Sequence, residues 1–123
     1  FLRNAKVDSH ANPKSVAVAG WNSMGPIVLA ARALAGDAID RAAADTKGFR
    51  FGKLLDYRDL MFLPGGAKYL DLPGMMALNA PHPLWLAGES KAPEVFGAKF
   101  AELTPFTGEA AEKESSAASW LLK

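Results

Sequence analysis

The chain has 123 residues, half of them hydrophobic, and a formal net charge of +1 at pH 7. This length suits one domain with enough apolar material for a core. The lysines and arginines are scattered, which argues against a nucleic-acid surface, and the apolar runs are far shorter than the roughly 20 residues of a membrane span. Cysteine is absent, so disulfides and thiol chemistry are excluded.

The beginning of the chain carries no pattern of a signal peptide. A soluble chain without cysteine fits a cytoplasmic protein and a secreted one equally well. Because the sequence opens at Phe1 instead of a methionine, we expect a processed product or a piece of a longer chain.

A strand, a sharp turn and a helix are predicted in succession near the N-terminus. The short apolar run at residues 15–19 predicts a buried strand. A turn punctuated by Gly20 and Gly25 follows it. The alanine-rich stretch 27–34 predicts a helix, which Gly36 ends. This succession is the plan of a nucleophile elbow, the turn that presents the catalytic serine of α/β-hydrolases.

The middle of the chain is harder to assign. Residues 38–45 are alanine-rich, which favours a helix, but their position after a helix and a Gly-Asp turn favours a strand, and we expect the strand. Residues 46–66 look like a loop, yet they carry many large apolar side chains. A loop of this composition is expected to lie against a core or a partner, or to line a pocket.

Four elements are predicted in the last part of the chain, and a proline-rich connector at residues 79–83 separates the first of them from the other three. They are a helix at 73–79, a buried strand at 84–88, a further strand at 96–103 and a helix at 109–122. The alternation of strands and helices predicts an α/β fold, with a mostly parallel sheet flanked by helices and a single domain over residues 1–123.

The order of these elements resembles the C-terminal half of an α/β-hydrolase, from the elbow strand to the last helix. It is most similar to the acetyl-xylan-esterase-like and dienelactone-hydrolase-like branches, where an Ala-Pro-Arg-Pro segment and an apolar strand precede the acid-bearing loop. Residues 80–84 read Ala-Pro-His-Pro-Leu here. The resemblance covers most of the chain and implies a partial hydrolase sheet. Another protein chain, or the N-terminal half of the same precursor, would then supply the earlier strands.

The elbow departs from the family pattern of small residue, any residue, nucleophile, any residue, small residue. If Ser23 is the nucleophile, Gly25 suits the second small position, but Trp21 occupies the first. A tryptophan there would crowd the crossing of strand and helix that small residues permit. Ser23 is therefore an imperfect match to the catalytic serine.

A second alignment of the elbow begins at Gly20. Asn22 then falls at the nucleophile position, and Met24 takes the second small position. Asparagine does not serve as a nucleophile in acyl transfer, but it tolerates the left-handed backbone of an elbow apex. We favour this interpretation, in which the turn is kept and the chemistry is lost, and keep Ser23 as the alternative.

The resemblance implies that Glu89, which follows the strand at 84–88, is the acid of the site. The alternative is an ordinary solvated loop glutamate beside Lys91, since exposure is the usual state of a glutamate. The sequence leaves both interpretations open.

A histidine base is missing from the place where the family has it. The stretch 103–108, between the expected last strand and the last helix, contains no histidine. His82 precedes its strand and His10 precedes the elbow strand, so both are expected at the opposite edge of the sheet. Because a serine needs a base within hydrogen-bond reach to lose its proton, catalysis by this chain alone is not expected.

Other chemistries have weaker support. No cluster of histidine, aspartate or glutamate has the spacing of a metal site. Asp56, Asp59 and Asp71 could in principle gather around a metal, but loop carboxylates are usually solvated. The spacing of Gly20 and Gly25 fits neither a P-loop nor a dinucleotide-binding fingerprint. We therefore expect neither a metal nor a cofactor.

Three functions remain open. The first is an α/β-hydrolase-like, esterase-related chain that is non-catalytic by itself. The second is a serine esterase for small acyl or acetyl esters, with Ser23 as nucleophile, Glu89 as acid and a base from a partner chain. The third is an α/β interaction or structural subunit that uses the apolar segment 49–62 as its interface.

Overall fold

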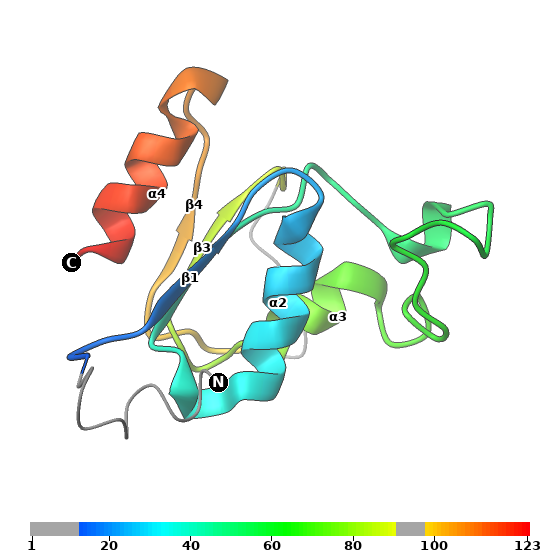
Figure 1. Ribbon diagram of the computed structural model, residues 1–123, viewed down its shortest axis with the longest axis horizontal. Coiled ribbons are helices and arrows are strands. Elements are labelled where there is room, and N and C mark those ends of the chain that lie inside the picture. The colour runs from blue at the N-terminus through cyan, green and yellow to red at the C-terminus, as the bar shows by residue number, and fades with distance from the viewer. Residues whose placement is uncertain (1–12, 91–97) are drawn as a thin grey trace.

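The structure, a computed structural model, describes residues 13–90 and 98–123, and these residues form an α/β fold (Figure 1). The strands are β1 (Ala17–Gly20), β2 (Arg41–Asp45), β3 (Leu84–Ala87) and β4 (Leu103–Pro105). The α-helices are α2 (Met24–Ala35), α3 (Asp71–Ala77) and α4 (Lys113–Leu121), and short 3₁₀ turns lie at Gly36–Ala38, Phe51–Lys53 and Ala110–Glu112. The strands form one all-parallel sheet in the order β1-β2-β3-β4. The predicted fold class is confirmed.

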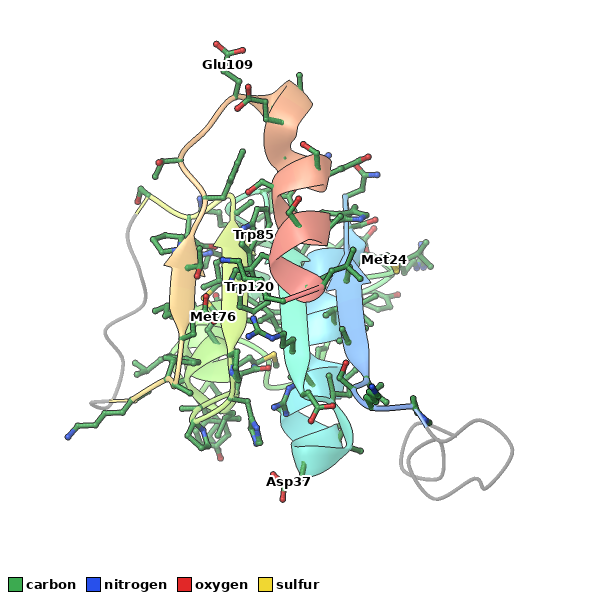
Figure 2. All side chains as sticks on the ribbon, turned by 90° about the vertical axis from the view of Figure 1, so that its left-hand side faces the viewer. Met24, Asp37, Met76, Trp85, Glu109 and Trp120 are labelled. Carbon is green, nitrogen blue, oxygen red and sulfur yellow. The ribbon has the colours of Figure 1, made fainter. Side chains whose placement is uncertain are left out.

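The two faces of the sheet bury alternate residues of its central strands. In β3, Leu84 and Leu86 belong to the core beneath α2 and α3, whereas Trp85 and Ala87 belong to the core beneath α4. Figure 1 shows α2 and α3 on one side of the sheet and α4 on the other. In Figure 2, Trp85 and Trp120 lie in the layer between the sheet and α4. Because helices cover both faces, β3 is continuously apolar.

β2 is a strand even though its sequence favours a helix. Ala42, Ala43 and Ala44 are fully buried between β1 and β3. Alanine is the best helix former, but the propensity difference is below about 1 kcal/mol per residue, and hydrogen bonding to a strand on each side outweighs it. The expected strand within residues 38–45 is confirmed.

The last strand lies later in the chain than the sequence predicted. We expected it at residues 96–103, but β4 begins at Leu103, opposite Leu84 of β3, and ends at Pro105. Residues 98–102 form no strand, and residues 91–97 lie outside the described part of the chain. Proline lacks an N–H, so it suits the last position of a strand at the edge of a sheet.

A polar network helps to attach α4 to the sheet. Trp120 Nε1 donates a hydrogen bond to Glu102 Oε1 at 2.7 Å, and Arg41 Nη1 lies 3.3 Å from Glu102 Oε2. The Trp120 hydrogen bond, followed by the charge of Arg41, lowers the pKa of the Glu102 carboxyl below its ordinary value of 4.5. The guanidinium of Arg41 also lies 4.8 Å from the centre of the Trp120 ring.

None of the helices in the described ranges has the length and the apolar character that crossing a bilayer requires.

Candidate functional site

The turn between β1 and α2 bends sharply at Asn22. Asn22 has φ of 55°, in the left-handed region that side-chain-bearing residues seldom adopt. Asparagine is among the few residues that adopt it readily. Ser23 follows with helical angles, φ −74° and ψ −4°, directly before the first turn of α2. Asn22 is thus the apex of the turn, and Ser23 lies one residue beyond it.

Two glycines allow α2 to approach the sheet closely. A Cβ on Gly20 would lie 2.7 Å from the Met24 carbonyl oxygen, and a Cβ on Gly25 would lie 2.0 Å from the Asp45 carbonyl oxygen. Met24, which the sequence placed at the second small position, is instead half exposed. The position that must stay small for α2 to pack against the sheet is therefore Gly25, three residues after the apex.

Ser23 lacks the contacts of an activated nucleophile. Within residues 13–90 and 98–123, its exposed hydroxyl makes no hydrogen bond. If Ser23 were the nucleophile, the N–H of Met24 would belong to the oxyanion hole. That N–H instead donates to the Trp21 carbonyl oxygen at 3.0 Å and closes the turn. Among the residues that the structure describes, Ser23 thus has neither a proton acceptor nor this oxyanion donor.

The histidines do not reach the turn. His82 precedes β3, at the edge where the strands begin, and its Nε2 lies 3.3 Å from Asp37 Oδ1. Figure 2 shows Asp37 at the opposite end of the molecule from Glu109, which follows β4. His10 lies outside the described residues. The edge where the strands end, which we call the carboxyl edge, holds Asn22 but not His82.

Glu89 lies at the carboxyl edge, and both of its oxygens are engaged. Arg50 Nη2 is 2.6 Å from Glu89 Oε2, and Arg50 Nη1 is 3.0 Å from Oε1. The Thr46 hydroxyl donates to Oε1 at 2.5 Å. The Glu89 side chain is only 10% exposed, and its hydrogen bond raises the pKa of Arg50. Glu89 is therefore neither a solvated loop residue nor free to orient a histidine.

Several charged residues around the turn were missed by the sequence analysis. Asp45, the last residue of β2, is buried, contacts Lys113 Nζ and accepts the Lys47 N–H at 3.1 Å. Lys47 Nζ in turn donates to Asn22 Oδ1 at 2.9 Å. The position of Asp45 could have been predicted from the sequence. The strand expected at 38–45 ends at Asp45, and the carboxyl ends of parallel strands meet at one edge of the sheet.

A pocket of about 410 Å³ opens beside Asn22 and Lys47. Its lining combines one cation, one amide, two hydroxyl groups and an apolar wall: Asn22, Ser23, Pro26, Thr46, Lys47, Phe49 and Met61. This mixture of an apolar wall and a few polar groups is typical of small-molecule sites. We call it the elbow pocket.

A larger pocket, of about 720 Å³, lies along α3 and is lined mostly by apolar residues such as Leu63, Met75 and Leu78. Its one carboxylate, Asp71, already accepts the N–H groups of Phe51 and Gly52 at 2.7 and 2.8 Å. The larger pocket therefore offers little chemistry, and the elbow pocket is the candidate site despite its smaller volume.

The three aspartates weighed as metal ligands hold backbone groups of the chain. Asp56 accepts the N–H of Arg58, and Asp59 accepts the N–H of Met61, both at 2.8 Å. In the part of the chain that the structure describes, no three histidine, aspartate or glutamate residues gather as they would around a metal ion.

The fold and the site together define a small α/β domain with a parallel sheet and a polar cluster at its carboxyl edge. Comparisons with protein-family models, with curated proteins and with solved structures find no match for this chain.

Proposed function

We propose that this chain is an α/β-hydrolase-like, esterase-related protein that does not hydrolyse esters by itself. The observation that carries the proposal is the left-handed backbone of Asn22 at the apex of the turn between β1 and α2. An α/β-hydrolase has its nucleophile at the corresponding turn. An asparagine amide does not attack an ester, so the turn keeps the shape of an elbow without its reactive group.

The surroundings of the turn support the same proposal. The segment between β4 and α4 contains no histidine. Glu89, at the place of the family's acid, is held by Arg50 and Thr46. Acyl transfer needs a nucleophile, a base and an acid that act as one unit, and the loss of any member reduces the rate by orders of magnitude.

Hydrolysis of p-nitrophenyl acetate and butyrate tests the proposal. We expect the wild-type chain and the Ser23→Ala variant to release p-nitrophenol at the same rate, equal to that of buffer alone. An assembled serine nucleophile would raise the rate by roughly 10⁶-fold, so the two cases are well separated. Activity that is lost in Ser23→Ala would overturn the proposal and favour a serine esterase with Ser23 and Glu89.

A role as an interaction subunit is a second candidate, and an exposed apolar segment favours it. Leu55 and Leu60 are fully exposed, and Figure 1 shows the loop between β2 and α3 extending away from the sheet. Among the described residues, β1 pairs on one side only, and it carries neither a charge nor a proline that would discourage pairing. We propose that another protein chain, or the N-terminal half of the same precursor, adds a strand beside β1 and covers this loop.

Leu60→Asp tests the interaction role without disturbing the core. Phe49 and Phe51 pack against the core with ring centres 4.9 Å apart, so a charge at either would test folding instead. We expect Leu60→Asp to change the free energy of unfolding by less than about 0.5 kcal/mol. In sedimentation of material from cells that make the protein naturally, the wild-type chain should run in an assembly, and the Leu60→Asp chain should run at a smaller mass. A wild-type chain that sediments at the same mass as the Leu60→Asp chain would contradict the candidate.

A further inference from the structure

We infer that the elbow pocket binds small monocarboxylates that carry a compact apolar body. The inference deepens the proposed function and rests on it, because it assigns a ligand to an elbow that does not cleave esters.

The charge of Lys47 is available to a ligand. Lys47 is the only cation that lines the pocket among the described residues, and its Nζ contacts the neutral Asn22 Oδ1 at 2.9 Å. The two nearby carboxylates are paired elsewhere, Asp45 with Lys113 and Glu89 with Arg50. A carboxylate that enters the pocket therefore gains a charge-assisted hydrogen bond without breaking an ion pair.

The backbone of Lys47 is held in an unusual conformation. Lys47 has φ of 49° and Gly48 has φ of 68°, so two successive residues are left-handed. The Lys47 N–H donates to Asp45 Oδ1, and the Gly48 N–H donates to Thr46 Oγ1 at 3.2 Å. Asp45 and Thr46 are buried, which fixes the turn. Left-handed side-chain-bearing residues cluster at ligand sites, and here Asn22 and Lys47, both left-handed, meet at the pocket.

The remaining walls define the size and character of the ligand. Pro26, Phe49 and Met61 supply an apolar surface. Ser23 adds an exposed hydroxyl group, whereas the Thr46 hydroxyl is engaged with Glu89. The volume of about 410 Å³ lies toward the small end of the range for small-molecule sites. One cation matches one negative charge, so a monocarboxylate such as benzoate or butyrate fits better than a dianion.

Titration of the isotope-labelled chain with benzoate, followed by amide NMR, tests the inference, with benzamide as the uncharged probe. We expect saturable shifts at the amides of Asn22, Lys47 and Gly48. Benzamide should bind at least about tenfold more weakly, because its carbonyl oxygen can accept a hydrogen bond from Lys47 but carries no negative charge to pair with the ammonium. Raising the salt concentration should weaken benzoate binding and leave benzamide binding unchanged.

Two lysine variants complete the test. Lys47→Met should weaken benzoate binding by about tenfold or more. Lys53→Met, an identical change at an exposed lysine outside the pocket lining, should leave it unchanged. The amide spectra show whether each variant is folded. Equal binding of benzoate and benzamide, or benzoate binding that survives in Lys47→Met, would overturn the inference.

The test separates the inference from the proposed function. Ester hydrolysis that depends on Ser23, found together with benzoate binding that depends on Lys47, would overturn the proposed function alone. If the chain does not hydrolyse esters and Lys47→Met binds benzoate as well as the wild-type chain does, the inference alone would be overturned.

Discussion

Gly25→Ala is expected to lower the free energy of unfolding by about 3 kcal/mol or more, the upper end of the cost of overpacking a core. The new Cβ would lie 2.0 Å from the Asp45 carbonyl oxygen and 2.5 Å from the carbonyl carbon. Both atoms are backbone of β2, at a residue that pairs with Ala87 of β3. They cannot rotate away as a side chain would, so α2 must move off the sheet and disturb the core around Val28 and Leu29.

Urea denaturation followed by tryptophan fluorescence measures this effect, and Gly52→Ala is the matched control. A Cβ on Gly52 would meet the end of the Asp71 side chain at 3.2 Å and the Ala67 Cβ at 3.7 Å, which is an ordinary contact distance. We expect Gly52→Ala to change the free energy of unfolding by less than about 1 kcal/mol. If Gly25→Ala proved as stable as the control, the close crossing of α2 and β2 would be wrong.

Trp85→Ala is expected to cost about 3–5 kcal/mol of stability, the usual range for truncating a buried tryptophan. Trp85 is 1% exposed and lies beneath α4. Its ring meets Trp21 edge-on with ring centres 5.8 Å apart, and the ring of Phe106 lies 5.2 Å away. Since Trp21 directly precedes Asn22, the loss of Trp85 should also loosen the turn between β1 and α2.

Trp85→Phe is the control, because it keeps an aromatic ring in the same layer. We expect it to cost less than half as much as Trp85→Ala in thermal or urea unfolding. An alanine variant that unfolds at the same urea concentration as the wild-type chain would show that the aromatic layer does not anchor α4.

β1 and α2 were predictable because the composition of each segment and the glycines and proline beside it favour the same element. The apolar run before Gly20 and the alanines after Pro26 each favour the element that forms. β2 was predicted only from its position, since its alanines favour a helix. β4 was placed too early, because the alanine-rich stretch before it resembles a buried strand, and only the register against Leu84 shows where pairing begins.

The candidate site was predictable only in part. The tolerance of asparagine for left-handed backbone indicated Asn22 as the apex of the turn, and this conformation is observed. The partners of Glu89 were not predictable, because Arg50 lies 39 residues away in the sequence and reaches it across the carboxyl edge. Lys47 was missed for the same reason, since its contact with Asn22 depends on the pairing of β1 with β2.

The most direct test of the central claim is the intact mass of the native protein after treatment with a fluorophosphonate, which labels activated serines. A serine without a base is not activated, so we predict an unchanged mass, both for the wild-type chain and for Ser23→Ala. A single adduct on the wild-type chain that is absent in Ser23→Ala would show that Ser23 is a working nucleophile and would contradict the account.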